Sequence, residues 1–261
     1  MTIHKKFADN VIKVIRNDIN IIGLAAGGSW INNEIDEFSD LDLILITKER
    51  IGGDKIKMTA YAKQFGELLS GFTGEHVGEP RVLICLYNNP VLHVDIKFIT
   101  PDEFRQRIEN PVILLDKTGE LKKILEETES KFPYPDFQWI EDRFWIWVHY
   151  ALLKTERGEY MEAFDFFGFL RMMVFGPLLL IRNGKLPRGV RKVEKELNSK
   201  DLEQLQKTIP IYTKAGLLET LNHSISLYRN LRKELYSSDI ILQKETEEKV
   251  MEYFYQVMKK K

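Results

Sequence analysis

GLAAGGSWINNEIDEFSDLDLILI, residues 23–46, holds the pattern that decides the fold: two apolar runs separated by a glycine pair and a polar segment. The first run, Ile19–Ala25, is short and ends at the glycine pair, which predicts a strand followed by a turn. The second run, Leu41–Ile46, has the length and the branched residues of a buried strand.

The turn between these strands has the composition of a phosphate-binding turn. Gly27-Gly28-Ser29 follows the first strand and precedes Trp30–Ile35, a segment able to begin a helix. Backbone N–H groups at such a junction bind phosphate, and glycines let that backbone come close to a ligand. We therefore predict that these three residues bind phosphate.

Two acidic residues open the second strand. Asp40 and Asp42 flank Leu41, and the period of two puts both carboxylates on one face of the strand. Magnesium prefers carboxylate and phosphate oxygens. The pair is therefore predicted to hold a metal ion beside the phosphate-binding turn.

A third acidic residue lies on a later strand. In Val91–Ile99 apolar residues alternate with polar ones, so His93 and Asp95 share the polar face. Asp95 would add a third carboxylate to the site, and close packing of like charges favours a bound cation. His93 is expected to be a hydrogen-bonded structural histidine, not a metal ligand.

The remaining pattern of the first half mixes helices and strands. The turn residues Asn88-Asn89-Pro90 predict a hairpin, and Thr100-Pro101-Asp102-Glu103 has the composition of a capping box at a helix start. Further helices are expected over 4–18, 55–69 and 120–130, and further strands over 81–87 and 112–115.

The second half is predicted to be all helical. Two prolines in Phe132–Asp136 break the pattern, which marks a domain boundary. The expected helices cover residues 139–155, 160–182, 202–208, 214–236 and 240–260. The fold class is therefore α+β, with a mixed-sheet domain over residues 1–132 and a helical bundle over residues 136–261.

Bulk properties exclude several classes of protein. The chain of 261 residues has a formal net charge of −1 and 44% hydrophobic residues, as in ordinary globular proteins, and it gives no global sign of nucleic-acid binding. The single Cys85 cannot form an internal disulfide, and no Cys/His cluster has zinc-ligand spacing. The N-terminus does not have the composition of a secretory signal, so we expect a cytoplasmic protein. The apolar stretch Phe164–Ile181 contains charged residues and a Gly-Pro pair, which favours a core helix over a membrane span.

The glycine turn, the Asp-x-Asp strand and the later HVDIKFI together resemble the signature of the polymerase-beta-like nucleotidyltransferases. The resemblance implies that Gly28 and Ser29 hold the triphosphate of a nucleotide, with Gly27 in the same turn. It also implies that Asp40 and Asp42 bind magnesium, and that Asp95 completes the site or assists deprotonation of the acceptor hydroxyl.

The second half, beginning FWIWVHYALLKTERGEYMEAFDFF, is similar to the C-terminal domain of aminoglycoside and lincosamide nucleotidyltransferases. That similarity implies that the helical domain binds the substrate and that Lys154 contacts phosphate. An acidic residue after the turn would act as a base or hold substrate amines, and Glu159, Glu162 and Asp165 all stay open for this role.

The expected reaction is magnesium-dependent transfer of a nucleotidyl group, with ATP as the expected donor, to a hydroxyl of a small acceptor such as an aminoglycoside or lincosamide. Pyrophosphate leaves. Two other functions stay open: a protein-nucleotidylating enzyme of a toxin–antitoxin type, and a nucleotide-binding regulator without turnover. The chain is expected as a monomer or homodimer, away from membranes and nucleic acid.

Overall fold

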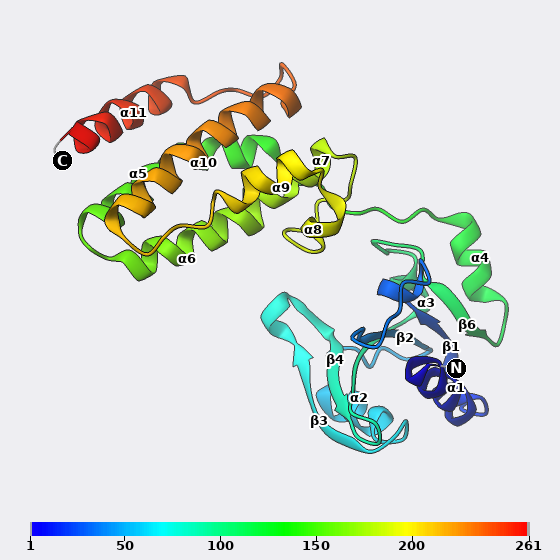
Figure 1. The fold of residues 1–261 in the computed structure, drawn as a ribbon. Coiled ribbons are helices and arrows are strands. Elements are labelled where there is room, and N and C mark those ends of the chain that lie inside the picture. Colours follow the sequence, from blue (N-terminus) through cyan, green and yellow to red (C-terminus); the bar gives the residue numbers. More distant parts are fainter. Residues whose placement is uncertain (1, 260–261) are drawn as a thin grey trace. The chain divides into compact units, whose positions relative to one another are not determined.

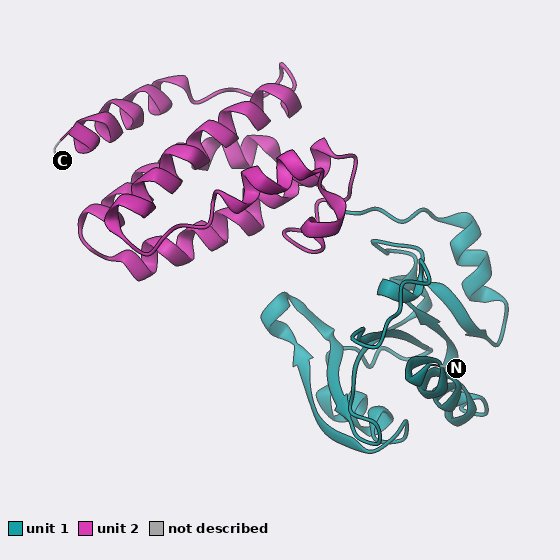
Figure 2. Ribbon diagram, in the orientation of Figure 1, with its two compact units in different colours: residues 1–132 teal, residues 133–261 magenta. Residues whose placement is uncertain are grey.

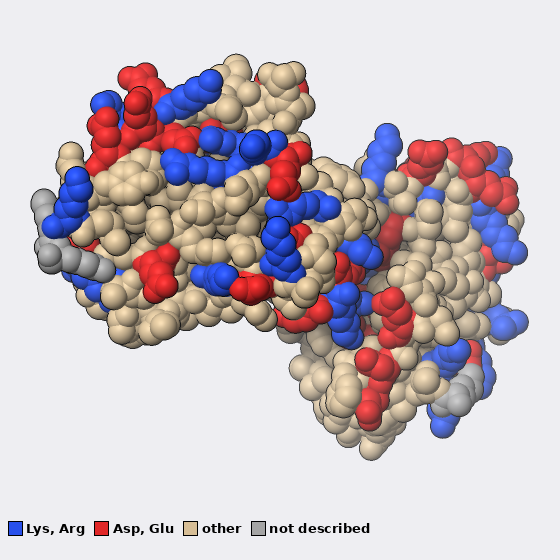
Figure 3. Space-filling view, turned by 45° about the horizontal axis from the view of Figure 1, so that its top comes forward, with Lys and Arg blue, Asp and Glu red and all other residues tan. Residues whose placement is uncertain are grey.

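The computed structural model describes residues 2–259, and the chain divides into two compact units, residues 1–132 and 133–261 (Figure 2). The first unit contains the β-sheet, whereas the second is built from helices (Figure 1). The predicted α+β class is confirmed. Basic and acidic side chains are interspersed on the face shown in Figure 3, in keeping with the net charge of −1.

The sheet of the first unit has six strands in the order β3-β4-β5-β2-β1-β6. Only the central pairing of β2 with β5 is parallel, and the other pairings are antiparallel, so the sheet is mixed as predicted. The strands are β1 (Ile21–Ala26), β2 (Leu41–Thr47), β3 (Leu68–Gly74), β4 (Glu79–Tyr87), β5 (Leu92–Ile99) and β6 (Val112–Asp116).

Helices cover both faces of this sheet. On one face, buried strand residues pack against Val11 of α1 and Met58 of α2. On the other face, buried strand residues pack against Phe104 of α3 and Leu121 of α4. These helices are α1 (Ile3–Ile15), α2 (Lys55–Ala62), α3 (Pro101–Phe104) and α4 (Glu120–Glu127), and short 3-10 helices occupy Gly28–Trp30 and Glu75–Val77. The predicted capping box at Thr100 is present, with Glu103 as its reciprocal partner.

Two local predictions are wrong. The segment Trp30–Ile35 does not begin an α-helix: only the 3-10 turn Gly28–Trp30 forms, and the chain then runs through turns with Asn33 in the left-handed region. Asn32 and Asn33 are weak helix formers that favour turns, which accounts for this. The helix expected over 55–69 ends at Ala62, and the strand Leu68–Gly74 that follows was not predicted.

The second unit contains no strand among residues 133–259. Its helices are α5 (Phe137–Glu156), α6 (Tyr160–Leu170), α7 (Gly176–Arg182), α8 (Val193–Glu196), α9 (Ser199–Gln206), α10 (Lys214–Leu235) and α11 (Lys244–Lys259), with a π-helical turn over Arg171–Phe175. The expected helix over 240–260 thus begins four residues later, and Lys260 lies outside the described residues.

A buried carboxylate ties three parts of this unit together. Glu141 of α5 is fully buried and accepts hydrogen bonds from the Tyr228 hydroxyl at 2.6 Å and the Arg232 guanidinium at 3.1 Å, both on α10. It also accepts the backbone N–H of Gln243, just before α11, at 2.9 Å. A buried charge is tolerated when it is paired in this way, so the network fixes how α5, α10 and the start of α11 pack.

One continuous helical stretch, Tyr160–Arg182, is long and apolar enough to cross a membrane by length and composition. Half of its most apolar window is buried inside the protein, and residues such as Phe167, Leu170 and Leu178 belong to the core of the second unit. The packing agrees with the prediction of a core helix.

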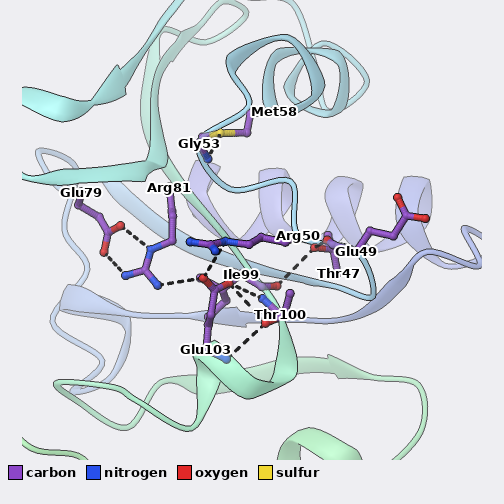
Figure 4. Close-up of polar contacts among 10 residues, drawn as sticks. All are labelled: Thr47, Glu49, Arg50, Gly53, Met58, Glu79, Arg81, Ile99, Thr100 and Glu103. Atoms are coloured by element: carbon purple, nitrogen blue, oxygen red, sulfur yellow. Dashed lines mark hydrogen bonds and ion pairs between the residues drawn. The ribbon is translucent and has the colours of Figure 1, made fainter.

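An ion-pair network closes the C-terminal end of β5 (Figure 4). Arg81 contacts both carboxylate oxygens of Glu79 at 2.6 Å and reaches Glu103 at 3.4 Å, and Arg50 contacts Glu103 at 3.5 Å. Lys97 contacts Glu79 at 2.8 Å. The hydrogen bonds from Arg81, helped by Lys97 and opposed by burial, lower the pKa of Glu79 to about 2.

We expect Glu79→Gln to lower the free energy of unfolding at pH 7 by on the order of 1 kcal/mol, because a partly exposed network contributes modestly. The depressed pKa of Glu79 means that its contribution is present above the pKa of the unfolded chain. The difference between wild type and variant should therefore shrink as the pH falls from about 5 to about 2.

Urea unfolding at pH 7, 4 and 2.5 measures this difference. Glu126→Gln, on the exposed side of α4, is the matched control and should show little effect. A wild-type advantage over Glu79→Gln that persists unchanged at pH 2.5 would contradict the assignment.

Candidate active site

The paired acids lie where the parallel strands begin. Asp42 is the second residue of β2 and stands directly opposite Asp95 of β5, and Asp40 immediately precedes the strand. All three are partly buried. Because β2 and β5 run parallel in register, the strand alternation that points Leu41 and Val94 into the core leaves Asp42 and Asp95 on the opposite face.

Asp95 is hydrogen-bonded to His93, and burial and nearby charges shift its pKa. Its Oδ1 lies 2.9 Å from His93 Nε2, so the expected hydrogen-bonded histidine is present. Burial raises the pKa of Asp95, the charge of His93 and its hydrogen bond lower it, and the charge of Asp40 raises it further. The last effect shows that Asp40 and Asp95 lie close enough for their charges to interact.

The glycine turn packs against these acids. The Gly27 N–H donates to the backbone carbonyl of Asp42 at 3.0 Å. Gly28 has a φ of +57°, and a Cβ placed on it would collide with the Asp42 carboxylate. Only glycine fits this position, which places the turn directly against Asp42.

An acidic residue that the sequence did not single out completes this turn. The Glu109 carboxylate accepts the Gly28 N–H at 3.0 Å, and its Oε1 would lie 3.1 Å from a Cβ on Gly27. Glu109 comes from the loop before β6, about 80 residues along the chain, and no spacing pattern connects it to the turn. A carboxylate oxygen thus lies against one of the amides that the sequence predicts to bind phosphate.

The loss of the predicted helix changes how the turn can bind phosphate. Ser29 lies in the 3-10 turn Gly28–Trp30, and its carbonyl accepts the N–H of Glu34 at 2.9 Å. No helix dipole of useful length begins here, so individual N–H groups would have to make the phosphate contacts.

The donor chemistry of the three aspartates suits magnesium, since all their ligand atoms are carboxylate oxygens. Within residues 2–259, however, no group of three or more acidic, histidine or cysteine side chains is arranged to hold a metal ion. The Asp42 carboxylate lies against Gly28 and the Asp95 carboxylate is bonded to His93. The three-carboxylate metal centre stays a prediction.

The predicted residues of the second unit form a separate cluster. Lys154 contacts Glu159 at 2.7 Å and Glu162 at 3.0 Å, and the Tyr150 hydroxyl is bonded to Glu162. Hydrogen bonds to Glu159 and then Glu162 raise the pKa of Lys154. Asp165, one turn further along α6, is exposed. The structure therefore brings Lys154 and two of the three candidate acids together, with the lysine charge balanced by carboxylates.

Comparisons with known proteins bear on the whole chain. An aminoglycoside 6-adenyltransferase from Bacillus subtilis is 16% identical, covers 99% of both chains and superposes with a TM-score of 0.41. A nucleotidyltransferase-like protein from Exiguobacterium sibiricum is 11% identical, with a TM-score of 0.38 over 98% of this chain and 80% of its own. No curated protein matches the chain.

A family model described as Streptomycin adenylyltransferase matches residues 1–257, nearly the full length. Membership of that family implies a nucleoside triphosphate as co-substrate and a small molecule as acceptor. The chain belongs to the streptomycin adenylyltransferase family and is a nucleotidyltransferase.

Proposed function

We propose that this protein transfers AMP from ATP to a hydroxyl group of a small acceptor, such as an aminoglycoside or lincosamide, in a magnesium-dependent reaction that releases pyrophosphate. The observation that carries the proposal is the packing of the Gly27-Gly28 turn against Asp42, directly across from Asp95. The amides proposed to bind phosphate and the carboxylates proposed to bind metal thus lie at the start of two parallel strands. Family membership supports the class of reaction.

In this proposal Gly27, Gly28 and Ser29 bind the phosphates of ATP. The contact of Glu109 with the Gly28 N–H supports this role, because it demonstrates that an anionic oxygen fits against that amide. Glu109 would have to give up this hydrogen bond when a phosphate takes its place.

Asp40 and Asp42 would hold the magnesium ion, with Asp95 as a third ligand or as the group that accepts the proton of the acceptor hydroxyl. Bound magnesium neutralises charge on the attacking and leaving oxygens of such a transfer. The Asp95 carboxylate suits proton acceptance by its position, opposite Asp42 at the start of β5 and hydrogen-bonded to His93.

For the helical unit, residues 136–261, we propose acceptor binding. Lys154 would contact a phosphate, and Glu159, Glu162 or Asp165 would hold acceptor amines or act as a base. The charge balance of Lys154 with Glu159 and Glu162 implies that ligand binding exchanges these ion pairs for others. We place the protein in the cytoplasm, in line with its one free cysteine, Cys85, which is buried.

Asp40→Asn and Asp42→Asn are each expected to lower acceptor-dependent release of pyrophosphate from ATP by at least about 100-fold, because each removes a carboxylate ligand of the magnesium ion that would offset the developing negative charge. Coupled phosphate detection across a panel of aminoglycosides and lincosamides measures the rate. Asp102→Asn, in the exposed first turn of α3, is the matched control. Unchanged rates in both active-site variants would refute the catalytic assignment.

Gly28→Ala should weaken ATP binding by roughly tenfold or more, because the new Cβ must displace the Asp42 carboxylate and shift the turn. Isothermal titration calorimetry gives the dissociation constant directly. Gly78→Ala separates this effect from backbone strain, since Gly78 has a φ of +76° but open space around a Cβ.

Gly78→Ala, the control, should lower the free energy of unfolding by about 1 kcal/mol and leave ATP affinity unchanged. Equal losses of ATP affinity in Gly28→Ala and Gly78→Ala would show that strain alone, and not the Asp42 contact, sets the effect.

A further inference from the structure

The first unit has a cavity beside Asp40. A cavity of about 380 Å³ is bounded by the start of α1 at Ile3, by residues 37–40, and by residues 91–93 at the start of β5. Asp40 and His93 both line it. The cavity therefore reaches the acid group that the proposed chemistry uses.

The walls of this cavity combine apolar and acidic groups. Phe38 is 88% exposed and Val91 is 66% exposed, whereas Glu37 and Asp40 supply carboxylates. No lysine or arginine of the described residues lines it. His93, which also lines the cavity, is hydrogen-bonded to Asp95 at 2.9 Å. Such a wall favours a ligand with an apolar ring surface and a positive charge.

The exposed ring of Phe38 is presented by a fixed backbone. His4 of α1 is 1% exposed, and its Nε2 lies 2.7 Å from the carbonyl oxygen of Ser39. Asp36 accepts the N–H of Phe38 at 3.0 Å and the hydroxyl of Ser39 at 2.9 Å. These hydrogen bonds attach the segment to α1 and fix its own turn. The Phe38 side chain is therefore exposed to solvent next to Asp40 and does not pack into the core.

We infer that this cavity is a subsite for the acceptor, and that it binds a ring bearing an amine or guanidine group. Phe38 would pack against the ring, Glu37 would pair with its cation, and the acceptor hydroxyl would then lie toward Asp40 and Asp95. The inference rests on the proposed function and names the part of the acceptor that the first unit recognises. A nucleobase fits less well, because neutral adenine has no positive charge to pair with Glu37.

Streptomycin, which carries two guanidine groups, is the probe, tested with ATP and Mg²⁺ on the full chain. Phe38→Ala should raise KM for streptomycin by roughly tenfold, as expected for loss of a ring or cation contact, with KM for ATP within about twofold. Glu37→Gln should raise it by about fivefold, and less at high salt, since a rim charge is screened. Phe72→Ala and Glu126→Gln are the controls: both residues are exposed in the same unit and lie outside the cavity.

Streptomycin binding without ATP, followed by calorimetry, gives a readout independent of turnover. Weaker binding in Phe38→Ala and Glu37→Gln, with unchanged unfolding temperatures, supports the subsite. Values equal to those of the controls overturn it, as does a parallel rise in KM for ATP, which would assign the cavity to the nucleobase. If wild type binds none of streptomycin, kanamycin and lincomycin, both the subsite and the proposed acceptor class are overturned, whereas wild-type binding that Phe38→Ala and Glu37→Gln leave unchanged overturns the subsite alone.

Discussion

The parallel pairing of β2 with β5 is the constraint on which both the core and the site depend. In this register Leu41 pairs with Val94 and Asp42 pairs with Asp95. A register shift of one residue would turn every apolar side chain of β2 to the other face of the sheet. The hydrophobic contacts that fix the register therefore also place Asp42 opposite Asp95. The packing of the core and the placement of the acids therefore depend on the same strand register.

The glycine turn shows how this alignment extends beyond the strands. Gly27 is bonded to the Asp42 backbone, and Gly28 leaves no room for a side chain beside the Asp42 carboxylate. The turn is thus held by the acid-bearing strand and not by a following helix. Glu109, which reaches Gly28 from a loop near β6, satisfies an amide that would otherwise need water or a ligand.

Much of this could be predicted from the sequence, since the apolar runs, the hairpin turn, the capping box and the double-proline break are local signals. The strand Leu68–Gly74 was missed because its two glycines and mixed polarity give no clear period. Glu109 could not be found at all, because its contact with Gly28 depends on tertiary folding. The burial of His4 was weakly indicated by the sequence, since His4 lies four residues before Ala8 on the buried face of α1.

The two ends of the central strands differ in how charge is balanced. At the C-terminal end of β5, Arg81 and Lys97 meet Glu79, and the pKa of that carboxyl falls. At the N-terminal end the cavity wall contains the carboxylates of Glu37 and Asp40 beside His93, with no lysine or arginine of the described residues, and burial raises the pKa of Asp95 although His93 lowers it. A folded protein keeps like charges together at a cost, which cations can remove. The end without lysine or arginine in its cavity wall is therefore the end at which we propose that a metal ion and a basic acceptor bind.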